Sequence, residues 1–199
     1  LVGAFKQPKL VLCDTGALKS LPHDFLVDGM GEVVKYGMIK SDELFGILMN
    51  HDINTVHEVM DDIIARCVAI KRDVVEADEF DKGERMLLNF GHTLGHSIEQ
   101  YYHYTGISHG RAVAKGMEII TDLAEKRGMC RKGLTADLCG CLKKYELTRD
   151  IGPTPAQLGS ACMNDKKRDG SSIHVIICSD IGKSSAVKMS VADFNDFLA

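Results

Sequence analysis

The stretch RMLLNFGHTLGHSIE, residues 85–99, decides which fold and chemistry to expect. At about 100° per residue in an α-helix, its polar side chains fall within a sector of roughly 80°. These side chains belong to Arg85, Asn89, His92, His96 and Glu99. Leucine, phenylalanine and isoleucine occupy the other faces. We therefore predict a helix with apolar neighbours on most sides and one polar stripe that faces a cavity or cleft.

Two glycines, Gly91 and Gly95, lie four residues apart in this predicted helix. Each costs about 1 kcal/mol relative to alanine in a helix interior, so local propensity does not explain them. Close approach of another backbone segment would explain both. The alternative interpretation of the stripe is a solvated surface helix, or histidines whose hydrogen bonds are satisfied by neighbouring core groups.

The two histidines of the stripe suggest a metal site. His92 and His96, at positions i and i+4, could both ligate one ion, as the two histidines of HExxH helices do. A carboxylate ligand would come from elsewhere. GMGEVVKYG offers Glu32, with Lys35 on the same helical face, and a surface ion pair between them is the alternative. SHGRAVAKGM places His109 at a helix start, where an ordinary cap region is the alternative.

Most of the remaining sequence is predicted to be helical. Hydrophobic periodicity predicts helices over 24–40, 42–50, 54–76, 83–104, 109–127 and 131–145, and a short one over 156–164. β-forming residues predict a strand over 9–15 and two strands around a turn within 165–190, followed by a last short helix. The predicted fold is mainly α, a helical bundle-like domain with small β-elements at both ends.

Composition is that of an ordinary folded protein. The 199 residues are 45% hydrophobic with a net charge of −4, which gives no electrostatic reason to bind nucleic acid or an anionic membrane. No window approaches the roughly 20 apolar residues that a membrane span needs. Seven cysteines without a CxxC pair predict reduced thiols and a cytoplasmic protein. Because no methionine opens the sequence, and a predicted strand follows almost at once, we expect a fragment of a longer protein.

Five segments, in this order and at these distances, resemble the 3-dehydroquinate synthase family. They are LVGAFKQPKLVLCDT, GMGEVVKYGMI, RMLLNFGHTLGHSIE, HGRAVAKGM, and NDKKRDG with the later IGKS. The resemblance spans nearly the whole chain but begins partway into the family's sequence. It implies that residues 1–20 are a remnant of the N-terminal NAD-binding domain. Residues 21–199 would then form the helical metal- and substrate-binding domain, which is the C-terminal domain of the dehydroquinate synthase-like fold.

The resemblance implies a particular ligand set when it is carried over by position. Glu32, His92 and His109 become the metal ligands, normally for Zn2+, with Co2+ as the alternative ion. This set replaces the suggestion that His96 is a ligand. Three protein ligands with open positions are typical of catalytic zinc, which binds and polarises adjacent hydroxyl and carbonyl oxygens.

Further side chains receive roles from the same resemblance. Catalytic roles fall to His96, Lys35 and Asn89, and substrate binding falls to Lys71, Arg85, Lys166 and Lys167. Several cationic groups suit a substrate that carries both phosphate and carboxylate. Without the resemblance, lysines such as Lys71 and Lys166 would be interpreted as solvated surface residues.

The implied reaction belongs to the shikimate pathway and aromatic amino acid biosynthesis. 3-Deoxy-D-arabino-heptulosonate 7-phosphate cyclises to 3-dehydroquinate with loss of phosphate. NAD, bound mostly by the missing N-terminal domain, oxidises a ring hydroxyl transiently, and the ketone is later reduced again. The resemblance also implies a homodimer that acts on this small sugar-acid phosphate.

Other functions stay open at this point. One is that of a related sugar-phosphate cyclase with a neutral substrate. Another is that of a metal-dependent polyol dehydrogenase, which would accumulate NADH. As an isolated metal-binding domain the chain would be inactive, because the family's site lies between two domains.

Three residues depart from the family pattern beside the proposed ligands. Arg111 follows His109 and Gly110, Lys115 lies four residues later, and Gly31 stands where alanine is usual. The two added positive charges could disfavour a cation site or could point to solvent.

Overall fold

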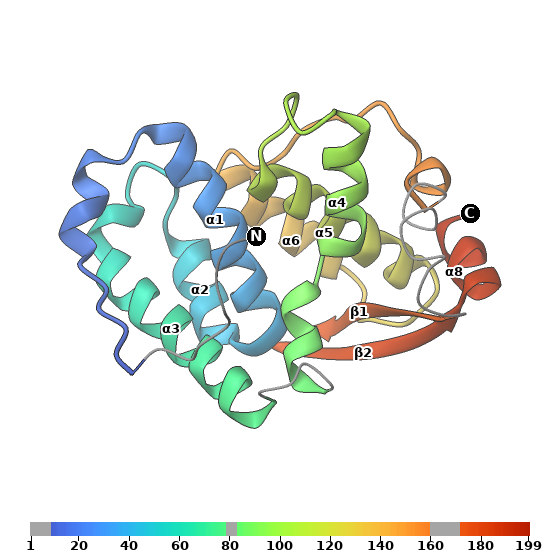
Figure 1. Cartoon of the computed structure of the whole chain (residues 1–199), viewed down its shortest axis with the longest axis horizontal. Helices are drawn as coiled ribbons and strands as arrows, with labels where there is room; N and C mark the ends of the chain where they lie inside the picture. The colour runs from blue at the N-terminus through green and yellow to red at the C-terminus, as the bar shows by residue number, and fades with distance from the viewer. Residues whose placement is uncertain (1–8, 79–82, 160–171) are drawn as a thin grey trace.

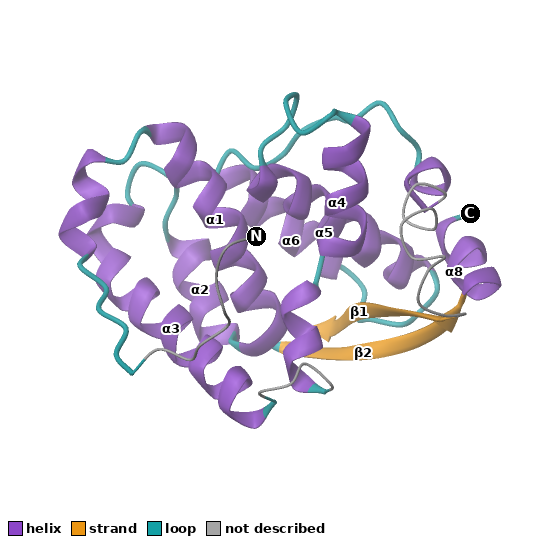
Figure 2. Ribbon diagram, in the orientation of Figure 1, coloured by secondary structure: helices purple, strands orange, loops and turns teal. Residues whose placement is uncertain are grey.

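The computed structural model describes residues 9–78, 83–159 and 172–199 and is mainly helical within them (Figures 1 and 2). Its helices are α1 (His23–Lys40), α2 (Asp42–Asn50), α3 (Met60–Ala77), α4 (His92–Tyr101), α5 (His109–Lys126), α6 (Leu134–Lys144) and α8 (Val191–Leu198). The described elements also include the 3₁₀ helices η1 (Thr15–Ser20), η2 (Val56–Val59) and η3 (Glu84–Asn89) and the strands β1 (Ser172–Asp180) and β2 (Lys183–Ser190). The predicted mainly α class is confirmed.

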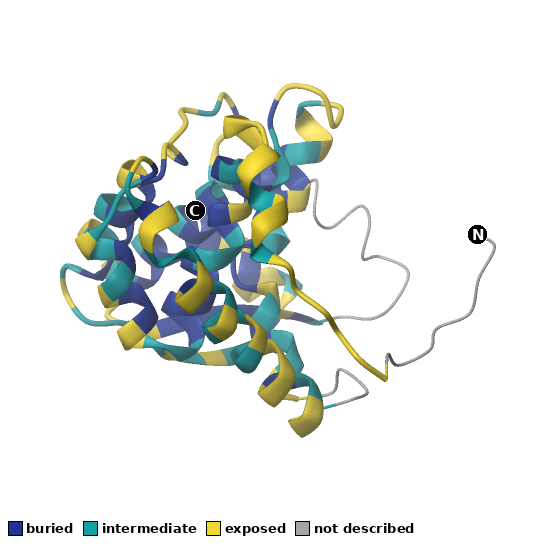
Figure 3. Ribbon diagram, turned by 90° about the vertical axis from the view of Figure 1, so that its left-hand side faces the viewer, coloured by how far each residue is buried: buried dark blue, intermediate teal, exposed yellow. Residues whose placement is uncertain are grey.

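Helix α5 is the central element of the fold. It packs against α1, α4, α6 and β1, and most of its residues are buried. In Figure 1, α1, α2 and α3 lie to one side of α5, and the β1–β2 hairpin with α8 lies to the other. Buried residues gather where these elements meet, while exposed ones cover the outer faces (Figure 3). One continuous apolar core therefore supports both ends of α5.

Local sequence explains where several elements begin. Ser41 caps α2 by accepting a hydrogen bond from the Leu44 amide at 3.1 Å, and acidic residues follow in the first turn. Ser190 and Asp193 form a capping box at the start of α8. The predicted pair of strands is confirmed as an antiparallel hairpin, in which Ser172 pairs with Ser190.

Glycines allow α4 to approach α5 closely. A Cβ added to Gly91 would lie 2.6 Å from the Val113 carbonyl oxygen, and one added to Gly95 would lie 3.1 Å from the Val113 Cα. From the other side, a Cβ on Gly116 would overlap the Gly91 carbonyl oxygen. The expected approach of another backbone to Gly91 and Gly95 is confirmed, and α5 is the neighbour.

The prediction of one continuous helix over 83–104 is wrong. The segment begins as η3, turns at Gly91 with φ of +78°, and continues as α4. A left-handed residue reverses the local backbone twist. The rotation of 100° per residue, which predicted Arg85 and Asn89 on the same stripe, therefore does not apply across Gly91. His92, His96 and Glu99 remain on one helix.

The strand predicted over 9–15 is also wrong. Residues 9–14 form no strand, and Leu10 and Leu12 are largely exposed. A strand requires a hydrogen-bonded neighbour, and within the described residues the only sheet pairs β1 with β2. The β-element expected at the beginning of the chain is therefore absent from the described part. Figure 3 shows the segment before η1 as exposed along its length.

The other predicted helices agree with the structure apart from their ends. The one predicted over 54–76 begins as η2 before it becomes α3, and α6 begins three residues later than predicted, after the left-handed Gly133. Of the short helix predicted over 156–164, the described part is helical from 155 to 159, and the rest lies outside the described residues. Among the helices described, none has the length and apolar character needed to cross a membrane.

Candidate metal centre

Three helices bring the three predicted metal ligands to one place. Glu32 lies in the middle of α1, and His92 and His109 are the first residues of α4 and α5. Their ligand atoms lie within 4.8 Å of one another. Glu32 Oε1 is 3.3 Å from His92 Nε2 and 3.9 Å from His109 Nε2. The turn at Gly91 and the close contact of α4 with α5 set the positions of both histidines.

The hydrogen bonds of the two imidazoles leave their Nε2 atoms directed at the carboxylate. His92 Nδ1 lies 3.1 Å from the Phe90 carbonyl oxygen, and His109 Nδ1 lies 3.2 Å from Glu99 Oε1. Neither acceptor carries a hydrogen when Glu99 is ionised, so in a neutral imidazole the proton sits on Nδ1 and the lone pair on Nε2. Glu32 Oε1 is buried and has no hydrogen-bond partner. Three acceptor atoms that converge without a donor fit a bound cation.

Glu32 is held in its ionised form. Burial would raise the pKa of its carboxyl, but the nearby His92 and the charge of Lys35 outweigh burial and lower that pKa to about 2. Lys35 Nζ donates a hydrogen bond to Glu32 Oε2, the oxygen that does not face the histidines. The two oxygens of one carboxylate thus serve different partners, and Oε1 remains available for a metal ion.

Lys35 is a buried cation and not half of a surface ion pair. Its side chain is 3% exposed. Burial lowers the pKa of its ammonium group, the charge of Glu32 opposes that shift, and the charge of Lys71 on α3 adds to it. The alternative interpretation of Glu32 and Lys35 as a solvated pair is therefore wrong. Lys71, by its effect on Lys35, belongs to the same electrostatic neighbourhood.

His96 lies beside the predicted ligand set. Its ring centroid is 5.6 Å from that of His92 and 6.1 Å from that of His109. Among the described residues, the other group that could hold a metal consists of His96, Glu99 and His109. No such group contains both His92 and His96, so the arrangement suggested by helical spacing alone is not formed in the described part of the chain.

The other predicted site residues lie on η3 or outside the described residues. Arg85 and Asn89 lie on η3, which packs against α1 and α3 and leads directly into the Gly91 turn. The Arg85 backbone amide donates to Asp78 Oδ2 at 3.1 Å, and Asn89 is exposed. Lys166 and Lys167 lie outside the described residues.

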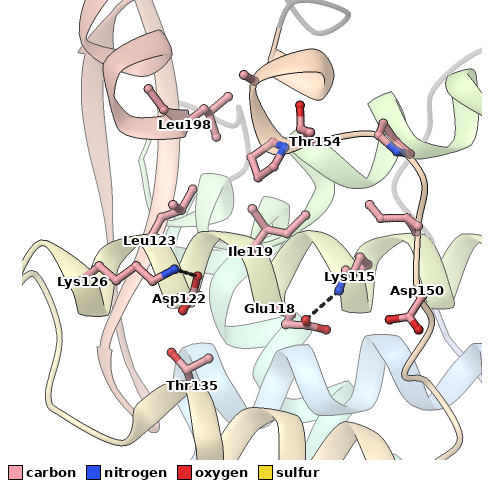
Figure 4. A pocket seen from close by; sticks show the side chains of 15 residues that line it. Lys115, Glu118, Ile119, Asp122, Leu123, Lys126, Thr135, Asp150, Thr154 and Leu198 are labelled. Atoms are coloured by element: carbon pink, nitrogen blue, oxygen red, sulfur yellow. Dashed lines mark hydrogen bonds and ion pairs between the residues drawn. The ribbon is translucent and has the colours of Figure 1, made fainter.

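The two unusual cations on α5 point away from the ligands. Arg111 contacts the Asp24 carboxylate, at 3.8 Å, and its Nε donates to the Glu146 carbonyl oxygen. Lys115 pairs with Glu118 at 2.7 Å. It lines a pocket between α5, residues 150–156 and the end of α8, and Figure 4 shows this pair there beside Asp150. None of the three predicted metal ligands lines that pocket.

Gly31 also has a structural explanation. A Cβ at this position would lie 2.7 Å from the Gly110 carbonyl oxygen. Helices α1 and α5 therefore approach each other too closely for alanine at this point. The same approach carries the Glu32 carboxylate to the start of α5, where His109 lies.

Sequence reasoning placed Glu99 on the polar stripe but gave it no role. Its carboxylate is the hydrogen-bond partner of His109, ten residues further along the chain. The only available signal was helical spacing, because Glu99 follows His92 by seven residues and so lies on the same face of α4. The contact itself depends on how α4 and α5 pack, which periodicity does not reveal.

The chain matches known proteins over most of its length. The sequence model described as 3-dehydroquinate synthase C-terminal matches residues 29–168. A 3-dehydroquinate synthase of Clostridium perfringens is 45% identical over 98% of this chain and 56% of its own length. One from Clostridium kluyveri is 41% identical over 100% of this chain and 56% of its own length. The chain therefore spans about half the length of the curated relatives it matches.

Solved structures share the fold at lower identity. A 2-epi-5-epi-valiolone synthase from Streptomyces hygroscopicus, with NAD+ and Zn2+ bound, has a TM-score of 0.80 and 22% identity over 93% of this chain and 53% of its own. A 2-deoxy-scyllo-inosose synthase complexed with carbaglucose-6-phosphate, NAD+ and Co2+ has a TM-score of 0.80 and 22% identity over 100% of this chain and 57% of its own. At these identities the likeness concerns the fold.

Proposed function

Because this chain belongs to the 3-dehydroquinate synthase family, we propose that the protein of which it is part is a 3-dehydroquinate synthase. The observation that carries the proposal is the convergence of Glu32, His92 and His109 around a buried carboxylate oxygen that has no hydrogen-bond donor. Residues 21–199 would form the helical metal- and substrate-binding domain, and residues 1–20 would belong to the NAD-binding domain.

The proposed reaction converts 3-deoxy-D-arabino-heptulosonate 7-phosphate to 3-dehydroquinate and phosphate. NAD+ and a Zn2+ or Co2+ ion, when bound, would supply transient hydride transfer and polarisation of substrate oxygens. Glu32, His92 and His109 would hold the ion. Substrate phosphate and carboxylate would be bound by Lys71, Arg85, Lys166 and Lys167.

The chemistry of three side chains suits catalytic roles. Lys35 is a desolvated cation, so its ammonium group attracts an anionic substrate more strongly than a solvated lysine would. His96 is exposed beside the proposed ligands, where an imidazole can exchange a proton with substrate. Asn89 offers a neutral amide that can donate to a hydroxyl or carboxylate oxygen without changing the charge of the site.

The family also supports proposals about the whole protein. We expect a cytoplasmic homodimer that acts on a small-molecule substrate. We also expect this chain alone to be inactive, because in the family the substrate is enclosed between the metal-binding and NAD-binding domains.

An assay of the full-length protein tests the proposed function. With the heptulosonate phosphate, NAD+ and zinc, phosphate should be released and no net NADH should accumulate, because the cyclase returns its hydride. Release of phosphate instead from a sugar phosphate that has no carboxylate would identify a cyclase that makes an inosose or valiolone. Net NADH formation would identify a polyol dehydrogenase. Absence of any turnover with the heptulosonate would contradict the proposal.

Arg111 and Lys115 should have little influence on metal binding. Both cations are paired with carboxylates or carbonyl oxygens away from the ligands. Replacing either by alanine should therefore leave the zinc dissociation constant within about fivefold of wild type, because such charges contribute less than about 1 kcal/mol. Competition with a chromophoric chelator measures this constant. A tenfold tightening in either variant would mean that the cation does oppose metal binding.

A further inference from the structure

His109 lies between two carboxylates that face its two ring nitrogens. Nε2 is 3.9 Å from Glu32 Oε1, and Nδ1 is 3.2 Å from Glu99 Oε1. The Glu99 side chain is 15% exposed and that of His109 is 42% exposed, so the carboxylate is the more buried partner of this contact. The mechanism proposed above gives Glu99 no part.

The two tautomers of His109 are not equivalent in this position. With the proton on Nδ1, the ring donates to Glu99 and presents its Nε2 lone pair towards Glu32. With the proton on Nε2, the Nδ1 lone pair would face the Glu99 carboxylate across 3.2 Å, and no donor would lie between the two acceptors. A metal ion binds only the nitrogen that carries the lone pair.

His92 obtains the same tautomer in a different way. Its Nδ1 partner is the Phe90 carbonyl oxygen, which belongs to the backbone of the Gly91 turn. That acceptor is present whatever side chain occupies position 90. The partner of His109 is a side chain, so substitution can remove it. Helix α4 thus supplies one proposed ligand directly and contacts another through Glu99.

We propose that Glu99 is a positioning residue of the metal centre. By accepting the Nδ1–H of His109, it holds that imidazole in the tautomer and orientation whose Nε2 can bind a cation together with Glu32. The metal-binding part of this inference rests on the proposed function. The same hydrogen bond engages His109 Nδ1, so His96, Glu99 and His109 do not form a second metal site.

The tautomer can be measured without any metal. Long-range ¹H–¹⁵N spectra of the histidine-labelled, metal-free chain, recorded at a pH at which the spectra themselves show neutral rings, distinguish the two forms. His109 should carry its proton on Nδ1 in the wild-type chain and become a mixture of tautomers in Glu99→Ala. Glutamine can accept through its oxygen or donate through its nitrogen, so Glu99→Gln should restore the contact but enforce the tautomer less strictly.

Zinc titration of the same variants gives the second measurement. Partners of metal-bound histidines typically contribute 10- to 100-fold to affinity, so Glu99→Ala should weaken zinc binding by roughly that factor and Glu99→Gln by less. Glu118→Ala is the matched control, because Glu118 is also partly buried but pairs with Lys115 on the far side of α5. It should change neither measurement, and circular dichroism should confirm that each variant is folded.

Three results would overturn the proposal. One is an unchanged Nδ1–H tautomer of His109 in Glu99→Ala. Another is a loss of zinc affinity in Glu118→Ala as large as that in Glu99→Ala. The third is a second equivalent of zinc that disappears with Glu99. If the wild-type chain bound no zinc at all, the proposed function would lose its metal centre, whereas the tautomer would still decide the role of Glu99.

Discussion

Replacing His92 by alanine should remove most of the zinc affinity of this chain. His92 contributes one of three convergent ligand atoms, and its Nε2 is the imidazole nitrogen nearer to Glu32 Oε1, at 3.3 Å. Apparent zinc-binding free energies of about 10–16 kcal/mol for four ligands correspond to roughly 3 kcal/mol per ligand, or about a hundredfold in the dissociation constant. Titration of the metal-free chain with zinc, with a competing chelator, measures the change.

His96→Ala is the matched control for this prediction. His96 lies one turn further along the same helix, and its ring lies 5.6 Å from that of His92. In the proposed ligand set it does not bind the ion, and zinc affinity should remain close to wild type. Equal losses in the two variants would contradict the ligand set, and a loss in His96→Ala alone would favour a site built from His96, Glu99 and His109. Retention of zinc by His92→Ala would contradict the ligand set as well.

Sequence patterns predicted the helical parts of the fold because the periodicity that indicates a helix lies within the helical segment itself. The periodic apolar residues of α1, α2 and α5, with breaks at their ends, placed these helices within one residue of their observed bounds. Patterns failed where a single backbone angle or a distant partner decides the structure. The left-handed φ of Gly91 splits the predicted central helix, and periodicity contains no information about the sign of φ. The segment 9–14 has a β-forming composition but lacks a neighbouring strand among the described residues.

The same distinction between local patterns and tertiary contacts applies to the candidate site. Helical spacing correctly placed His92, His96 and Glu99 on one face of α4. It could not decide which histidine joins Glu32, because that depends on how α1, α4 and α5 cross. The resemblance suggested His109 in place of His96, and the geometry brings His109 and Glu32 together, whereas the ligand roles themselves stay predictions. The Nδ1 partners of the two histidines, a backbone carbonyl and Glu99, are tertiary contacts, so no pattern along the chain revealed them.

Alanine at position 116 should destabilise the fold and weaken the metal site together. A Cβ at Gly116 would overlap the Gly91 carbonyl oxygen and lie 3.0 Å from the Gly95 amide nitrogen. These are backbone atoms, so no side-chain rotation relieves the clash and α4 must move away from α5. Overpacking of this kind costs about 1–3 kcal/mol or more, a large part of a typical stability of about 5–15 kcal/mol. Because Gly91 immediately precedes His92, the displacement also moves a proposed ligand.

Gly140→Ala is a control that should change the stability of the chain in the opposite direction. Gly140 lies inside α6, and no heavy atom comes within 4 Å of the position its Cβ would take. Alanine there should stabilise the chain by about 0.4–1 kcal/mol, through helix propensity and a less flexible unfolded state. Urea unfolding of the metal-free chain should therefore show a lower midpoint for Gly116→Ala and a higher one for Gly140→Ala, and zinc affinity should fall only in the first. If Gly116→Ala also raised the midpoint, close contact between α4 and α5 would not be what holds His92 in place.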